Sequence, residues 1–184
     1  MNEKKVFLIV LVIPLINSCE LDNRIIDFYN GCDEKLINYE SISINIQTKD
    51  FNYPLETYLG KNINEYKFGL MCREDLSPNI DGMIFQYEQE QEQKGFWMYK
   101  TYFPLTIIYF DKFGNSVGLS SMEPCTRKIL ETKNRFEFRC LEESYDYLPT
   151  KKYINVLEIK NDYKYLEEII SLEKEENLRL IIKN

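Results

Sequence analysis

The chemistry open to this chain is limited by one omission: none of its 184 residues is a histidine. A Ser-His-Asp or Cys-His nucleophile system therefore cannot form, and a histidine-ligated metal site is excluded as well. Catalysis would have to rest on carboxylates, lysine, tyrosine or cysteine. Because no catalytic motif brings such residues together, we expect no catalytic residues, no metal site and no cofactor.

A small group of side chains could instead bind a ligand. Trp97, the single tryptophan, would offer an aromatic face, while Arg73 and nearby carboxylates would supply hydrogen bonds that fix the orientation of a sugar or a small polar ligand. Structural roles are the alternative, since Arg73 could pair with a carboxylate and Asp111 could cap a turn. The candidate ligand-binding residues are Arg73, Trp97, Thr101 and Glu123, with Asp111 as a further polar position.

Five cysteines are present, and four of them are candidates for disulfides. Cys19 has a separate role at the N-terminus, which leaves an even number outside the cytoplasm. Three pairings are open; we prefer Cys125–Cys140 with Cys32–Cys72, the first because it closes a short loop. The alternative is that some of them are buried free thiols. No C-x-x-C motif occurs, so neither a redox site nor a zinc site is supported.

The first 18 residues are typical of a lipoprotein signal peptide. Lys4 and Lys5 precede an apolar stretch of eleven residues, 6–16, which is too short to span a bilayer as a helix. The following Ile16-Asn17-Ser18-Cys19 resembles a bacterial lipobox, and we expect Cys19 to carry the lipid that holds the protein on the membrane. Ordinary cleavage without a lipid and an uncleaved anchor are the alternatives. Glu20 favours the outer membrane if the host has two membranes, with the domain facing the periplasm or the exterior.

The composition favours a folded, aromatic-rich β domain. The chain has 14 tyrosines and 11 phenylalanines, and its formal net charge is −7. Such a charge gives no electrostatic footprint for DNA or RNA, so we expect no nucleic-acid partner. Residues 19–40 are polar and charged and are predicted to form a tether, and residues 41–184 are enough for one domain with a core.

Short strands dominate the predicted secondary structure. Ile42, Ile44 and Ile46 alternate with polar residues, the period of a half-buried strand. Asn62 and Glu65 resemble a capping box that begins one short helix, and Asp162 begins a second. Residues 88–94 and 127–139 are predicted to be surface loops. Further strands are expected at residues 55–59, 83–87, 95–101, 106–111, 116–122, 153–159 and 178–182. This predicts a mainly β fold, a single sandwich or barrel-like domain with two short helices.

A series of short motifs runs through the segment from Gly69 to Cys125. They are Gly69-Leu70-Met71-x-Arg73, Gly82-Met83-x-Phe85, Phe96-Trp97-Met98-x-x-Thr101, Pro104-Leu105, Phe110-Asp111-x-x-Gly114, Met122-Glu123-Pro124-Cys125 and, further on, Tyr153-x-x-Val156-Leu157-Glu158. In order and spacing these motifs resemble the family named domain of unknown function 192, and the candidate ligand residues lie at matching positions. The resemblance implies a compact, mostly β and often exported fold, and it supplies no activity.

These features together predict an envelope-anchored domain that binds a glycan, a small polar ligand or an envelope protein without catalysis. One alternative is a hydrolase of envelope glycans that uses Asp111 and Glu123 as acid and base, which requires the two carboxyl groups to lie about 5 to 10 Å apart. A purely structural lipoprotein is the other alternative. An exposed Trp97 in a groove would favour binding, and a fully buried Trp97 would favour the structural role.

Overall fold

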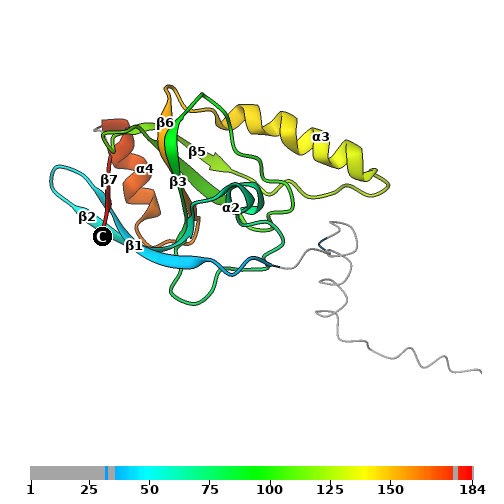
Figure 1. Cartoon of the computed structure of the whole chain (residues 1–184), viewed down its shortest axis with the longest axis horizontal. Helices are drawn as coiled ribbons and strands as arrows, with labels where there is room; N and C mark the ends of the chain where they lie inside the picture. The colour runs from blue at the N-terminus through cyan, green and yellow to red at the C-terminus, as the bar shows by residue number, and fades with distance from the viewer. Residues whose placement is uncertain (1–31, 33–35, 176–177, 184) are drawn as a thin grey trace, which may run out of the picture.

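Seven strands form one sheet that curls into a half-barrel (Figure 1). The computed structural model describes residue 32 and residues 36–175 and 178–183, so the predicted signal peptide and Cys19 lie outside the described residues. The strands are β1 (Glu40–Gln47), β2 (Asn52–Gly60), β3 (Gly82–Gln91), β4 (Leu105–Phe110), β5 (Ser116–Met122), β6 (Tyr153–Lys160) and β7 (Arg179–Ile182). The helices are α2 (Ile63–Phe68), α3 (Lys133–Glu143), α4 (Leu166–Glu175) and the 3₁₀ helix η1 (Ser144–Tyr147).

The strand order is β5-β4-β6-β3-β2-β1-β7, and every neighbouring pair is antiparallel except β2 and β3. α2 lies in the crossover between these two parallel strands, which cannot be joined by a tight turn. The two edge strands approach each other at one end. There the Ser116 amide donates to the Leu178 carbonyl at 2.8 Å, and the Leu180 amide donates to the Gly114 carbonyl at 2.8 Å. These contacts bring the two edges of the half-barrel together at this end, which agrees with the barrel-like alternative.

Both faces of the sheet are buried, and each belongs to a separate apolar core. Along β3, Met83 and Phe85 enter one core while Ile84 enters the other, as the pleat of a strand requires. The first core also contains Phe136 of α3, and the second contains Ile169 of α4. The mainly β prediction is confirmed, and the helices cover opposite faces of one sheet.

Two predicted segments differ from the structure. Residues 88–94 were expected to be a solvated loop, but β3 continues to Gln91, where it pairs with Tyr153 after an irregularity in register. The last residues of β3 are mostly exposed, so they do not show the alternation of apolar and polar residues by which a half-buried strand is recognised. Residues 95–101 were expected to be a strand, but they run irregularly with one isolated bridge between Tyr99 and Cys125. Lys100 has a φ of 55°, which a strand does not allow.

A third helix, α3, occupies much of the stretch that was predicted to be a surface loop between Cys125 and Cys140. The Thr132 side chain caps it by accepting a hydrogen bond from the Arg135 amide at 3.3 Å. Only Phe136 and Cys140 within the helix are buried, one turn apart on the same face. Two buried positions, with Phe138 and Leu141 exposed among charged residues, are a weak periodic signal, which explains why this helix was not predicted. α4 begins at Leu166, four residues later than Asp162 indicated.

Candidate functional site

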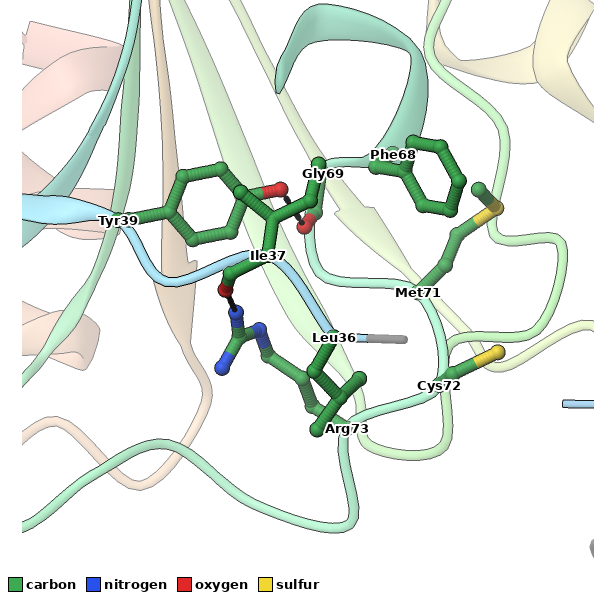
Figure 2. Close-up of a pocket in the computed structure, with 8 residues that line it drawn as sticks. All are labelled: Leu36, Ile37, Tyr39, Phe68, Gly69, Met71, Cys72 and Arg73. Atoms are coloured by element: carbon green, nitrogen blue, oxygen red, sulfur yellow. Dashed lines mark hydrogen bonds between the residues drawn. The ribbon is translucent and has the colours of Figure 1, made fainter. Parts of the chain in front are cut away.

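Arg73 packs against two neighbouring aromatic rings and is partly buried. Its guanidinium carbon is 5.0 Å from the ring centroid of Tyr39 and 5.0 Å from that of Tyr58, and its terminal nitrogen donates to the Ile37 carbonyl (Figure 2). The Tyr39 hydroxyl donates to the Gly69 carbonyl at 2.7 Å. These contacts join the segment before β1 to the chain after α2. Arg73 therefore has a structural role, which was the alternative to ligand binding in the sequence analysis. Its partners are two aromatic rings and a backbone carbonyl.

The cavity beside Arg73 is too small for a ligand. Its volume is about 10 Å³, which is close to the space of one water molecule. Burial raises the pKa of Tyr39 to about 12, against the opposing effect of the Arg73 charge, so this phenol remains neutral at physiological pH. The region around Arg73 is therefore a packed contact between a charged side chain and aromatic rings, and not a ligand site.

The other polar candidates are dispersed. Asp111 accepts hydrogen bonds from the amides of Phe113 and Asn115, both at 2.9 Å, so it caps the turn between β4 and β5. Thr101 is buried, and its amide donates to the Met98 carbonyl at 3.2 Å. Glu123 has an exposed side chain. Arg73 and Trp97 line different pockets, and Asp111, Thr101 and Glu123 line none of the pockets described below, so the predicted set does not form one surface.

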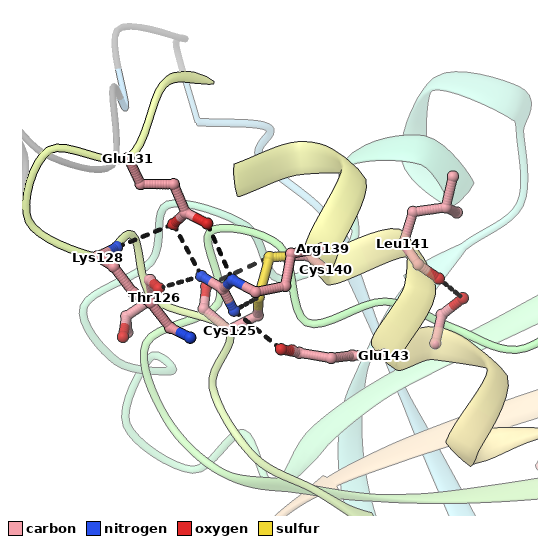
Figure 3. The surroundings of a disulfide bond; sticks show 9 residues. Cys125, Thr126, Lys128, Glu131, Arg139, Cys140, Leu141 and Glu143 are labelled. Carbon is pink, nitrogen blue, oxygen red and sulfur yellow. Dashed lines mark hydrogen bonds and ion pairs between the residues drawn. A yellow bond between two sulfur atoms is a disulfide. The ribbon is translucent and has the colours of Figure 1, made fainter. Parts of the chain in front are cut away.

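Cys32 is bonded to Cys72, and Cys125 is bonded to Cys140, which are the two pairings that the sequence favoured. The second disulfide lies against an ion-pair network (Figure 3). The Arg139 guanidinium donates to both carboxylate oxygens of Glu131 at 3.0 Å and to Glu143 at 2.9 Å. The Arg139 hydrogen bonds hold the pKa of Glu131 at about 2, well below its usual range. The loop between the two cysteines is therefore held at its base.

Among the described residues, one group has sulfur and carboxylate atoms close enough together to hold a metal ion. It consists of Cys125, Cys140 and Glu143, whose ligand atoms lie within 4.8 Å of one another. Both sulfurs are already joined in a disulfide, so neither can act as a thiolate ligand. This group is a structural crosslink and not a metal site.

We expect removal of the Cys125–Cys140 disulfide to destabilise the domain by about 3 kcal/mol, because the bond closes a loop with a sequence separation of 15. The test is urea denaturation of the double variant Cys125→Ala and Cys140→Ala under oxidising conditions. Since Cys32–Cys72 remains, reductant should lower the stability of the variant less than that of the wild type. Equal unfolding midpoints for the two proteins without reductant would contradict the expectation.

Trp97 lines a groove of about 320 Å³ on the side of the sheet that carries the first core. Half of its lining residues are aromatic, and residues from separate parts of the chain meet there. We call it the aromatic groove; its lining residues are Tyr66, Tyr87, Gln91, Lys94, Gly95, Phe96, Trp97, Leu141, Ser144 and Tyr153. A second hollow of about 460 Å³ shares Tyr66, Tyr87 and Gln91 with it and extends it past the start of α2. The size suits a small ligand or a few sugar rings.

One wall of the aromatic groove is set by α2 and β3. Asn62 begins α2 by accepting hydrogen bonds from the amides of Asn64 and Glu65, at 3.1 and 3.2 Å. This cap places Tyr66 on the next turn, where its hydroxyl donates to the Gln86 carbonyl of β3 at 2.5 Å. The ring of Tyr66 then lies 4.4 Å from that of Tyr87, measured between centroids. The helix cap that the sequence predicted at Asn62 therefore helps to position one wall of the aromatic groove.

The opposite wall is formed by residues 95–97 and the end of α3. A Cβ on Gly95 would lie 1.9 Å from the Ser144 carbonyl oxygen, so glycine is needed for the loop to approach η1 this closely. The Trp97 ring packs 5.1 Å from Tyr99, whose ring lies 4.8 Å from Phe136 of α3. Trp97 is partly buried, so one part of the indole is held by packing while another faces the groove.

The base of the aromatic groove is neutral. Tyr153 packs between Tyr87 and Tyr109, with centroids 5.9 and 5.0 Å away. Burial raises the pKa of Tyr153 to about 12 and raises that of Tyr87 still further, so both phenols keep their protons. The groove can therefore stack flat, weakly polar surfaces and hydrogen-bond hydroxyl groups. Asp111 and Glu123, the pair considered for glycoside hydrolysis, do not line it.

Sequence reasoning found Trp97 but missed the other rings of the groove. Tyr66, Tyr87 and Tyr153 are three of 14 tyrosines, and no spacing in the chain links them. Their common face arises because β3 pairs with β6 while α2 lies over the end of β3. No helix in the described part of the chain is long and apolar enough to cross a membrane.

Comparison with known proteins identifies a family and a shared fold. The sequence profile of DUF192, described as "Uncharacterized ACR", matches residues 45–162. No curated protein matches the chain. A "putative transcription regulator" from Sinorhizobium meliloti is similar in structure, with a TM-score of 0.56, 18% identity and coverage of 80% of this chain and 98% of that one. A protein of unknown function from Novosphingobium aromaticivorans gives a TM-score of 0.57, 18% identity and coverage of 80% and 89%. At this identity the likeness shows the fold alone.

Proposed function

This chain belongs to the DUF192 family, and from that premise we propose that it is an envelope-anchored, non-catalytic domain whose aromatic groove binds sugar rings or a similar small polar ligand. The family supplies no activity, so the proposal depends on the groove itself. The observation that carries it is the position of Trp97, partly buried, in a groove that Tyr66, Tyr87 and Tyr153 also line.

Aromatic rings bind the apolar faces of sugars by stacking, and neighbouring polar groups then select among hydroxyl arrangements. The groove contains both kinds of group, since Gln91, Lys94 and Ser144 lie beside the rings. Its tyrosines are neutral donors and acceptors, and none of its lining residues is acidic. These properties support binding of a neutral or weakly anionic glycan more than chemistry on it.

The anchor rests on the N-terminal sequence. The apolar stretch 6–16 is followed at once by Ile16-Asn17-Ser18-Cys19, and a lipid on that cysteine would hold the domain at the membrane. β1 begins at Glu40, close to the predicted end of the tether. An exported glycan-binding domain would then meet its ligands in the cell envelope.

We expect envelope glycan fragments to shift the fluorescence of Trp97 in a saturable way, because it is the single tryptophan and lines the groove. Trp97→Ala and Tyr87→Ala should each weaken binding about tenfold or more when measured by calorimetry, since aromatic anchors dominate binding energy. Phe113→Ala is the matched control, because Phe113 is 67% exposed and does not line the groove. An emission that no glycan perturbs, with Trp97→Ala unchanged in every titration, would reject the binding role.

A further inference from the structure

Two aliphatic side chains are presented to solvent at the tip of the loop before α3. Ile129 is 80% exposed and Leu130 is 95% exposed; we call these two residues the apolar tip. The Glu131 amide donates to the Lys128 carbonyl at 3.0 Å, so the apolar tip occupies the two central positions of a four-residue turn. Leu130 has a φ of 65°, a conformation that favours glycine or asparagine. A large aliphatic residue therefore stands where a small one would fit best.

The turn is held firmly, so the exposure of the apolar tip is built into the fold. Glu131, which closes the turn, accepts a hydrogen bond from the Lys128 amide at 3.0 Å and binds Arg139 through both carboxylate oxygens. The Arg127 side chain donates to the Glu131 carbonyl at 2.7 Å. The Cys125–Cys140 disulfide fixes the base of the same loop (Figure 3). These contacts keep Ile129 and Leu130 from folding back onto the protein.

The charges around the apolar tip are opposite in sign to those of the chain as a whole. Residues 126–135 contain four cationic side chains and one carboxylate, Glu131, which Arg139 already engages, whereas the whole chain has a net charge of −7. The four cations are Arg127, Lys128, Lys133 and Arg135. An exposed aliphatic pair with basic neighbours is complementary to the surface of a membrane that contains anionic phospholipids.

The position of the loop also fits this partner. Figure 1 places the loop before α3 at the same end of the domain as the segment leading into β1, and β7 at the other end. We propose that the apolar tip enters the anionic lipid surface of the membrane on which the protein is anchored, and so sets the orientation of the domain. The apolar tip is separate from the aromatic groove. Its proposed role rests on the proposed function only for the presence of a lipid anchor.

The experiment compares two tryptophan variants of the full chain on vesicles whose acyl chains carry bromine, which quenches tryptophan at close range. Leu130→Trp reports on the apolar tip. Phe113→Trp is the matched control, because Phe113 is also an exposed apolar residue in a turn and lies near β7, at the other end of the domain. The vesicles contain phosphatidylcholine with or without phosphatidylglycerol. Flotation of the same samples measures anchoring separately, and circular dichroism confirms folding.

We expect the added tryptophan in Leu130→Trp to lose about half of its fluorescence on vesicles with phosphatidylglycerol and less on phosphatidylcholine alone, while Phe113→Trp is unaffected. Protein that floats without quenching of Leu130→Trp would overturn the proposal and leave the anchor intact. Protein that neither floats nor is quenched would overturn both. A blue shift of Leu130→Trp that depends on protein concentration and not on lipid would assign the apolar tip to a contact between copies of the chain, and would equally overturn it.

Discussion

Replacement of Gly82 by alanine is expected to lower the free energy of unfolding by about 3 kcal/mol or more, because the new methyl group has no space. A Cβ at this position would lie 2.0 Å from the Glu158 carbonyl oxygen and 3.1 Å from the Ile159 Cα. Gly82 pairs with Ile159 across β3 and β6, near the centre of the sheet. Backbone atoms of a central strand cannot move aside without breaking the hydrogen bonds of both neighbours.

Gly60→Ala is the matched control for this prediction. Gly60 also lies in a strand, but the atom nearest to a Cβ at this position would be the terminal methyl carbon of Met83, at 2.9 Å. The next atom would be a ring carbon of Phe85 at 3.0 Å. One flexible side chain and one ring must therefore adjust, and the expected cost is about 1 to 2 kcal/mol, below that of Gly82→Ala. Urea denaturation of both variants measures the difference. Similar losses for Gly82→Ala and Gly60→Ala would show that the close approach of β3 and β6 does not require glycine.

The second large expected effect is a dependence of stability on pH, and it comes from Glu158. The carboxyl group of this residue is buried in the apolar core on the groove side of the sheet. Glu158 is 5% exposed and pairs with Met83 on β3 and Ile107 on β4. Burial raises the pKa of Glu158 to about 8. The groups that interact with its charge are the phenols of Tyr39, Tyr87 and Tyr109, whose own pKa values it helps to raise.

A raised pKa in the folded state makes stability depend on pH in a definite direction. Below the ordinary glutamate pKa of about 4.3 both states are protonated, and the contribution of Glu158 to stability is complete. Between that value and about 8 the unfolded chain loses its proton while the folded protein keeps it, so stability falls as pH rises. The loss is on the order of 5 kcal/mol for a shift of this size, and it is complete once the pH has passed the folded pKa.

We therefore expect Glu158→Gln, which imitates the neutral acid, to flatten the decline in stability between about pH 5 and about pH 9. Unfolding free energies measured across this range for both proteins test it. Asp81 and Glu173 also have raised pKa values, so only the difference between wild type and variant reports on Glu158. Glu131→Gln should act in the opposite sense: it should lower stability at neutral pH, and its difference from wild type should shrink as the pH falls, because the pKa of Glu131 is lowered to about 2. Parallel curves for Glu158→Gln and wild type would refute the assignment.

Local signals in the sequence predicted the parts of the fold that depend on near neighbours. The alternation of Ile42, Ile44 and Ile46 predicted β1, since a half-buried strand needs only one apolar face. The cap at Asn62 predicted α2 for a similar reason, because its partners lie two and three residues away. α3 was missed because only Phe136 and Cys140 of the helix are buried, and their partners lie elsewhere in the chain.

The candidate site shows the same division. The sequence by itself identified Trp97, because a lone tryptophan is conspicuous, and it named the two disulfide pairings that the structure contains. Only the tertiary structure decided that Arg73 packs against two tyrosines and that Tyr66, Tyr87 and Tyr153 line the same groove as Trp97. The physical reason is that strand pairing and the crossover bring together residues separated by tens of positions. The hydrophobic period of one strand or helix shows which of its faces is buried, but it does not show against which other element that face packs.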